Sequence, residues 1–315
     1  MERIVDISTD GLHLSVVRGF MTVSQDHQER GRIALDDIGA VIAHAHGLTW
    51  TNNLFVQLSK RNVPVVICAA NHAPVTCLWP LEGHHRQSVR MRAQAAASKP
   101  LMKQIWRQIV SAKISMQAAV IASTGKEAND LAAMAKRVKS GDPENMEAQA
   151  ARRYWNALMG PDFRRDREAD GTNALLNYGY TVLRAILSRT ICAAGLHPTF
   201  GIHHANQNNA FALADDLMEP YRPLVDRMVL SLAEAGIESV TPEAKTRLAG
   251  LAGLDLETET GWSPLHVHAG RFVHSVAEAL LTKTAPASPA SLNAPQAPSP
   301  LALANLRALA ERDDG

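Results

Sequence analysis

Short apolar or alternating runs, separated by turn-forming residues such as Asp10 and Gly11, fill the chain up to about residue 80. Runs of this length and spacing are typical of β-strands. The predicted strands cover residues 3–8, 12–18, 20–24, 33–35, 38–42 and 63–67. One amphipathic helix is predicted at 51–60, where Leu54 and Leu58 recur at helical spacing.

The hydrophobic pattern changes near residues 80–83, and from about residue 88 apolar positions recur at helical intervals. The predicted helices cover residues 88–98, 100–122, 127–138, 143–159, 172–194, 209–234, 242–251 and 265–283. A small β-rich part followed by a run of helices predicts an α+β fold. We expect a β-rich domain at 1–84 and a larger all-α domain at 85–283.

The last stretch, 284–315, differs from both predicted domains. Five prolines lie among alanines and serines between residues 284 and 300. Such a segment has too little apolar surface to fold alone, which predicts a disordered tail. The pattern at 301–312 is compatible with a short amphipathic helix within this tail.

Composition narrows the class of protein. Of the 315 residues, 46% are hydrophobic and 20% are charged, the balance of an ordinary globular protein. No apolar run reaches the ~18 residues of a membrane helix, and the N-terminus MERIVDIST lacks the apolar region of a signal peptide. Three scattered cysteines fit a reducing compartment. We therefore expect a cytoplasmic protein with no membrane partner.

Three separate segments supply candidate metal ligands, and the first is the predicted helix 143–159. With Asp142 as the N-cap of this helix, Glu147 lies on a stripe of small and apolar residues. A buried carboxylate there needs a cation or hydrogen-bond donors. A glutamate near a helix start can also be held by the helix dipole alone, so spacing leaves both interpretations open.

The other two segments lie further along the chain. His203 and His204 are adjacent in a predicted loop, while Asp216 and Glu219 share one face of the next predicted helix. A surface histidine and a solvated acidic face are the alternatives. Together with Glu147, one imidazole and two carboxylates could hold a divalent ion. Oxygen-rich ligation with one nitrogen suits Mg²⁺ or Mn²⁺.

Four motifs in the helical part resemble those of the CRISPR-associated integrase family. They are EAQAARRYW at 147–155, NALLNYGY at 173–180, GLHPTFGIHH at 195–204 and ADDLMEPYRP at 214–223. The first is similar to the family signature E-G-x-A-A-R-x-Y-W. This chain departs from the family pattern at Ala148, where glycine is usual, at His197, where aspartate is common, and at His203, where an apolar residue is common. The resemblance covers about residues 1–283 and is to the short type II form, II-C.

The resemblance implies that Glu147, His204 and Glu219 are the metal ligands and the catalytic residues, with Asp216 as a supporting carboxylate. It implies a DNA integrase and endonuclease that depends on Mg²⁺ or Mn²⁺. Such an enzyme inserts short foreign DNA fragments into a CRISPR repeat array by 3′-OH attack on a phosphodiester. The implied partners are DNA (protospacer and repeat), a second copy in a homodimer, and the small ferredoxin-like acquisition subunit.

Basic and polar residues near these motifs are candidate DNA contacts. Because the net charge is only +1, DNA binding would rest on local clusters. The candidates are Arg152, Arg164, Arg165, Asn173, Asn177, Tyr180, Arg184 and Arg222. Phosphate contacts of this kind position DNA without reading its sequence. For any single arginine, a solvated surface charge is the alternative.

Two other functions are compatible with the sequence. One is a metal-dependent nuclease specific for DNA structure, and the other is a DNA-binding scaffold without catalysis. Metal-dependent strand transfer separates the three, because a scaffold would bind DNA equally well without the metal and make no covalent product.

Overall fold

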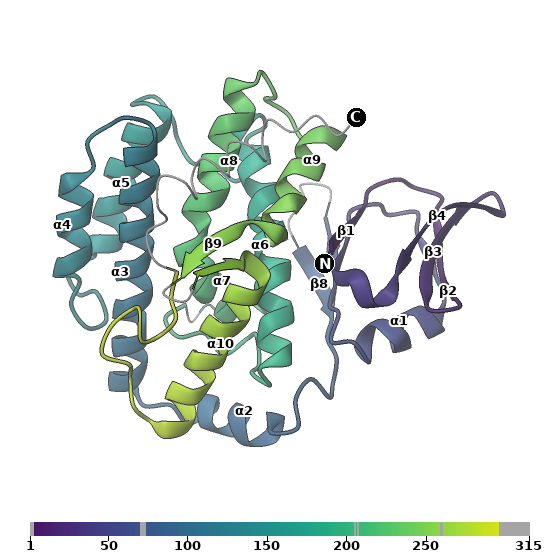
Figure 1. Cartoon of the computed structure of the whole chain (residues 1–315), viewed down its shortest axis with the longest axis horizontal. Coiled ribbons are helices and arrows are strands. Elements are labelled where there is room, and N and C mark those ends of the chain that lie inside the picture. Colours follow the sequence, from purple (N-terminus) through teal and green to yellow (C-terminus); the bar gives the residue numbers. More distant parts are fainter. Residues whose placement is uncertain (1–2, 70–73, 205, 207, 259–260, 296–315) are drawn as a thin grey trace.

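The N-terminal part of the computed structural model forms two sheets of four strands each (Figure 1). The structure describes residues 3–69, 74–204, 206, 208–258 and 261–295. One sheet has the strand order β4-β3-β2-β6 and the other the order β1-β5-β7-β8. The strands are β1 (Arg3–Ile7), β2 (His13–Val17), β3 (Phe20–Gln25), β4 (Gln28–Ala34), β5 (Ile38–Ala43), β6 (Thr49–Trp50), β7 (Val65–Cys68) and β8 (Pro74–Leu78).

The first sheet is made mostly of hairpins, in which β3 pairs antiparallel with both β2 and β4. The predicted helix is present as α1 (Asn52–Ser59), and Leu54 and Leu58 are buried. Thr51 begins this helix by accepting the backbone N–H of Leu54 at 3.4 Å. The apolar sides of this sheet and of α1, together with one face of the second sheet, form a small core.

The second sheet joins this small core to the helical part. Its middle strand β5 is buried along its whole length, as expected for a parallel strand covered on both faces. Because side chains alternate along a strand, Val41 lies in the small core, while its neighbours Ala40 and Ile42 lie in the large helical core. The edge strand β8 has no counterpart among the predicted strands.

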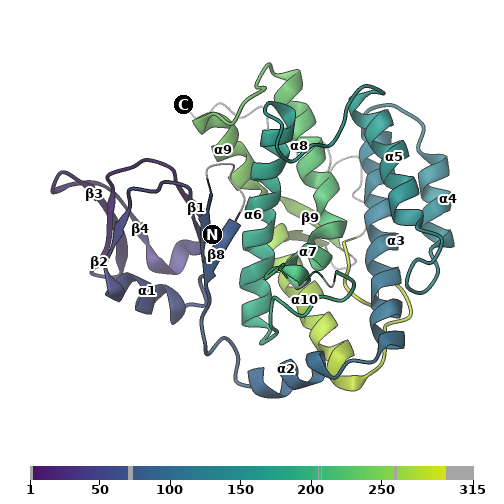
Figure 2. The same cartoon turned by 180° about the vertical axis from the view of Figure 1, so that it is seen from behind.

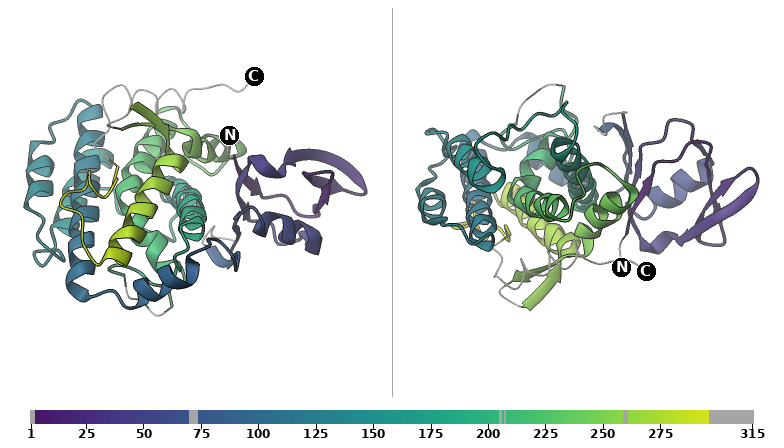
Figure 3. Two further views of the ribbon diagram at one scale, coloured as in Figure 1. Left: turned by 60° about the horizontal axis from the view of Figure 1, so that its bottom comes forward. Right: turned by 90° about the horizontal axis from the view of Figure 1, so that it is seen from above.

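The helical part contains a short hairpin and the predicted run of helices (Figure 2). The helices are α2 (Gln87–Ala95), α3 (Lys99–Ser123), α4 (Asn129–Arg137), α5 (Met146–Met159), α6 (Thr172–Ala193), α7 (Ala212–Met218), α8 (Arg222–Glu234), α9 (Pro242–Ala249) and α10 (Leu265–Thr282). Helix α6 contacts β5, α8, α9 and α10 and is buried on most of its surface. Figure 3 shows the N-terminal sheets to one side of these helices. The predicted α+β class, with the β-rich part first, is confirmed.

Two details of the helical part differ from the prediction. The helix predicted at 209–234 is divided at Pro220 and Pro223 into α7, the 3-10 turn Glu219–Tyr221 and α8. The antiparallel strands β9 (Asp255–Thr258) and β10 (Gly261–Pro264) were not predicted.

The stretch predicted as a disordered tail is also different in its first part. Residues 284–295 form turns that bury Leu292 and Ala294 in the large core. The side chain of Gln108 on α3 donates a hydrogen bond at 3.1 Å to the carbonyl of Pro286, so this stretch lies against α3. The rest of the tail, including the helix expected at 301–312, lies outside the described residues. Within the described part of the chain, no helix is both long and apolar enough to cross a membrane.

Candidate active site

One pocket of about 350 Å³ in the helical part gathers side chains from distant segments. Lys113 of α3, His204 of the loop after α6 and Glu219 at the α7–α8 corner line it. Glu147 of α5 reaches the same place, because its Oε1 lies 2.6 Å from the Nζ of Lys113. The structure therefore brings all three predicted ligands to one site.

Glu147 is held at the first turn of α5. The chain passes through Asp142 (φ 48°) and Asn145 (φ 52°) in the left-handed region, so the helix begins at Met146. The Asp142 carboxylate accepts the backbone N–H groups of Met146 at 2.8 Å and Glu147 at 3.0 Å. The predicted start at 143 was wrong, but the predicted capping side chain does satisfy the helix N-terminus.

Glu219 is the most enclosed of the three. Its side chain is only 6% exposed and lies 2.8 Å from the Nε of Arg222 and 2.5 Å from the Nζ of Lys113. Burial alone would raise the pKa of Glu219, but Arg222 and Lys113 outweigh it and hold the pKa below its usual value. This carboxylate is therefore an anion in a site with little access to water.

His204 is oriented from behind by Asp216. The wholly buried Asp216 carboxylate accepts the backbone N–H groups of Ile202 at 2.5 Å and His203 at 2.8 Å, and it also hydrogen-bonds the Nδ1 of His204. That last bond raises the pKa of His204. The ring of His203 stacks on Trp106, with centroids 4.3 Å apart. The Nε2 of His204 is therefore the ring nitrogen left for a ligand.

The donor set of this pocket fits a hard divalent cation. Two carboxylates and one imidazole are present, and the buried Oε2 of Glu219 faces the ammonium of Lys113 at 2.5 Å. Oxygen-rich sets with one nitrogen suit Mg²⁺ and Mn²⁺. As the described side chains stand, no three His, Cys, Asp or Glu residues form a ready-made metal cage, and Lys113 lies between the two glutamates.

Two arginines, Arg165 and Arg222, form a basic wall beside these acids, and Arg222 pairs with Glu219 at 2.8 Å. Arg165 and Arg222 both lie over the ring of Tyr180, at 5.5 and 4.6 Å from its centroid. Arg165 is fixed there by hydrogen bonds to the side-chain oxygens of Asn173 (2.9 Å) and Asn177 (2.5 Å). Positive groups held beside a cluster of acids suit a phosphate bound between them.

The other residues expected to contact DNA lie in different settings. Arg184 pairs with Asp215 at 2.7 Å. Arg152 and Arg164 are exposed and do not line the pocket. Of the candidates on α6, Asn173 and Asn177 thus hold Arg165 in place, while Arg184 is itself held by Asp215 of α7.

Asp226 and Lys113 are features of the site that the sequence analysis missed. Asp226, wholly buried on α8, accepts hydrogen bonds from the hydroxyls of Tyr154 (2.9 Å) and Tyr180. Burial raises the pKa of Asp226 to about 7. Both residues could have been found from the sequence, because each is a single charged residue on the apolar face of a predicted helix.

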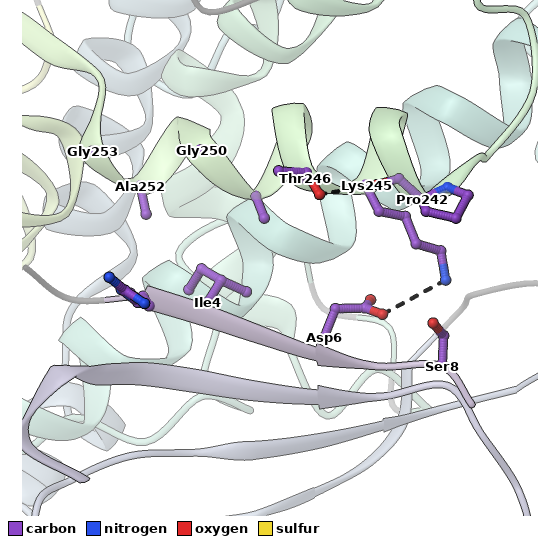
Figure 4. Close-up of a pocket in the computed structure, with 11 residues that line it drawn as sticks. Ile4, Asp6, Ser8, Pro242, Lys245, Thr246, Gly250, Ala252 and Gly253 are labelled. Atoms are coloured by element: carbon purple, nitrogen blue, oxygen red, sulfur yellow. Dashed lines mark hydrogen bonds and ion pairs between the residues drawn. The ribbon is translucent and has the colours of Figure 1, made fainter. Parts of the chain in front are cut away.

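A second cavity, of about 480 Å³, lies between β1 and α9 and holds none of the predicted ligands (Figure 4). Asp6 in its wall is 3.6 Å from the Nζ of Lys245. It also accepts a hydrogen bond from the hydroxyl of Tyr178 at 2.9 Å and lies 3.0 Å from His44. These contacts link the second sheet to the helices, so the polar groups of this cavity already have structural roles.

Two glutamates, a histidine and a basic wall around one pocket suit an enzyme that acts on phosphodiesters. The family model for CRISPR associated protein Cas1 matches residues 5–242, and the chain belongs to this family. The CRISPR-associated endonuclease Cas1 of Neisseria meningitidis is 37% identical over 246 residues, which cover 76% of this chain and 79% of that protein. The Pyrobaculum aerophilum protein named CRISPR-associated endonuclease Cas1 1 is 28% identical over 243 residues, or 70% of this chain and 79% of the relative.

Solved structures share the fold. A casposase bound to an integration product has a TM-score of 0.77 at 22% identity and covers 92% of this chain and 93% of its own. A Cas1 protein from Thermotoga maritima has a TM-score of 0.71 at 16% identity, covering 88% and 97%. A Cas6-RT-Cas1–Cas2 complex has a TM-score of 0.72 at 20% identity, covering 90% of this chain and 35% of that one.

The backbone at Gly201 approaches the histidine support so closely that a side chain should disrupt it. A Cβ at this position would lie 2.5 Å from the carbonyl oxygen of His204 and 2.9 Å from the Oδ2 of Asp216. We expect Gly201→Ala to shift this loop and to lower DNA endonuclease activity about a hundredfold, the effect of a misplacement of roughly 1 Å. Gly270→Ala is the control, because nothing lies within 4 Å of a Cβ there. Equal activity of the two variants would show that the close approach is unimportant.

Proposed function

We propose that this protein is a divalent-metal-dependent DNA integrase that inserts short foreign DNA fragments into a CRISPR repeat array. The convergence of Glu147, His204 and Glu219 on one pocket is the observation that carries the proposal. These residues would be the metal ligands, with Mg²⁺ or Mn²⁺ as the ion, and Asp216 would support His204. Family membership and the endonuclease names of the relatives support the same function.

In this reaction a free 3′-OH attacks a phosphodiester and displaces another 3′-oxygen. A bound divalent cation supplies a Lewis acid for the phosphate and stabilises charge on the leaving oxygen. Asp216 keeps the ring of His204 oriented for ligation. Arg165 and Arg222, fixed over Tyr180, neutralise the phosphate and hold it in line with the nucleophile.

Further DNA contacts belong to the same proposal. Arg152 and Arg164 are exposed beside the pocket segments and would bind phosphates outside it. Asn173, Asn177 and Tyr180 would act mainly by holding the basic wall. Arg184, which pairs with Asp215, would bind phosphate beside it. The protospacer and the repeat would lie along this wall.

The assembly is proposed on the motifs and on the fold. We infer a homodimer formed through the β-rich domain at 1–84, with the catalytic domain at 85–283 and a tail at 284–315. The small ferredoxin-like acquisition subunit would complete the complex, in a type II-C system in the cytoplasm. A Cas1–Cas2 complex among the structures that share the fold supports a second subunit.

Removing the metal tests the function. Purified protein, a short duplex with free 3′-OH ends and a plasmid carrying a repeat should give a joined product with Mn²⁺ or Mg²⁺ and none with EDTA. Excess Mn²⁺ should restore the product, because EDTA removes only the bound ion and does not alter the protein covalently. Cleavage without joining would favour the structure-specific nuclease. Binding that is unchanged by EDTA, with no covalent product, would favour the scaffold.

A further inference from the structure

Lys113 occupies the centre of the acidic cluster. It lies on α3 next to the buried residues Ala112 and Ile114, and its side chain is only 11% exposed. Its Nζ lies 2.6 Å from the Oε1 of Glu147 and 2.5 Å from the Oε2 of Glu219. An ammonium this deep in a protein is stable only with paired carboxylates, and here two carboxylates share one ammonium.

Both glutamates share the same ammonium. Lys113 donates a hydrogen bond to Glu147, and the Oε2 of Glu219 lies 2.5 Å from the same Nζ. The other oxygen of Glu219 faces Arg222 at 2.8 Å. Each oxygen of Glu219 therefore already faces a side-chain cation.

An ammonium and a divalent cation cannot use the same carboxylate oxygens at once. Mg²⁺ binds oxygen at about 2.0–2.1 Å, well inside the separation at which these oxygens hold the Nζ of Lys113. The lysine stem, however, has four carbons that rotate freely, and the ammonium already lines the pocket beside Arg165 and Arg222. It can therefore leave the glutamates without leaving the site.

We propose that Lys113 is a built-in counter-ion that competes with the divalent cation for Glu147 and Glu219, and that metal binding moves its ammonium into the pocket, toward the phosphate. The inference rests on the proposed function, since it takes these glutamates as metal ligands. In the metal-free protein, Lys113 keeps two like charges from repelling each other. With metal bound, it adds a positive group to the basic wall.

Replacing Lys113 by methionine tests the competition directly. Lys113→Met keeps the length of the stem but removes the charge, so the two glutamates face each other until a metal arrives. We expect Mn²⁺ to bind about tenfold more tightly or better, as measured by the loss of the free-ion electron paramagnetic resonance signal without DNA. In EDTA the variant should melt at a lower temperature than the wild type, and Mn²⁺ should raise its melting temperature by more.

Two further variants make the test decisive. Lys139→Met removes a lysine that pairs with Glu144 on the surface, and it should leave Mn²⁺ affinity unchanged. Lys113→Gln keeps a hydrogen-bond donor for Glu147 without the charge and should also tighten Mn²⁺ binding. It decides the matter if Lys113→Met does not fold.

The possible outcomes separate this inference from the proposed function. Unchanged or weaker Mn²⁺ binding in the folded Lys113 variants would overturn the competition, whatever the wild-type activity. A wild-type protein that binds Mn²⁺ but joins no DNA would overturn the integrase function, while tighter binding in the variants would still support the counter-ion role.

Discussion

Replacing Glu147 by glutamine should reduce strand transfer at least about a thousandfold while leaving the protein folded. The amide keeps the shape of the side chain but loses the charge that binds a metal ion. Losing a metal ligand removes several kcal/mol of transition-state stabilisation, and each ~1.4 kcal/mol is a factor of ten in rate. The side chain of Glu147 is 23% exposed, so the fold depends on it less than on Glu219. Joined product over time, with Mn²⁺, measures the effect.

Glu144→Gln is the matched control for this experiment. Glu144 lies on the same segment, but its carboxylate is exposed and pairs with Lys139 outside the pocket. Strand transfer should stay within about twofold of the wild type, because exposed ion pairs contribute little. If Glu147→Gln kept substantial strand transfer at saturating Mn²⁺, Glu147 would not be a metal ligand.

The helices that form the site were predictable because apolar residues recur in them at helical spacing. The start of α5 shows where local signals fail. Asp142 followed by Pro143 has the pattern of an N-cap and a first helical residue, but Asp142 and Asn145 adopt positive φ and delay the helix. The Asp142 side chain still caps the helix, but from four residues before its start. The capping residue was therefore predicted correctly, and the first residue of the helix was not.

The missed strands have a different cause. The edge strand β8 has largely exposed side chains, among them Val75 and Leu78, so its sequence lacks the alternation of a half-buried strand. Pairing with β7 fixes it, and that contact is not visible in local sequence. The buried turns at 284–295 are similar, because Leu292 becomes a core residue through contacts of this stretch with α3 and α10, which the local sequence does not show.

In the candidate site, the sequence pointed to residues that stand in motifs, but not to residues whose role depends only on tertiary contacts. Glu147, His204 and Glu219 stand in recognisable runs. Lys113 and Trp106 do not, because on a predicted helix they resemble a stray charge and an ordinary core residue. Their roles depend on segments more than thirty residues away, namely α5 and the loop after α6.

The buried carboxylate of Asp226 should make the stability of the protein depend on pH. Its pKa is raised from 3.8 to about 7 in the folded state, chiefly by burial. A raised pKa means that the folded state holds the proton more tightly than the unfolded state does. The stabilising contribution is therefore complete below about pH 4 and is lost as the pH rises through about 7. Three pKa units correspond to about 4 kcal/mol.

Asp226→Asn should remove this dependence, because the amide does not ionise and its oxygen still accepts a hydrogen bond from Tyr154 or Tyr180. We expect the free energy of unfolding of the wild type, minus that of the variant, to fall by about 4 kcal/mol between pH 4 and pH 8 and then level off. Urea unfolding in EDTA across this range measures it, and the difference cancels the contributions of other groups.

Tyr154→Phe supplies an internal check on the cause. The Tyr154 hydroxyl donates to Asp226 and lowers its pKa, so losing that donor should raise the pKa further. In Tyr154→Phe, the stabilising contribution of Asp226 should therefore be lost at a higher pH than in the wild type. A wild-type minus Asp226→Asn difference that stayed flat from pH 4 to pH 8 would contradict the raised pKa. It would mean that the two tyrosines and Arg222 stabilise the ionised carboxylate fully despite its burial.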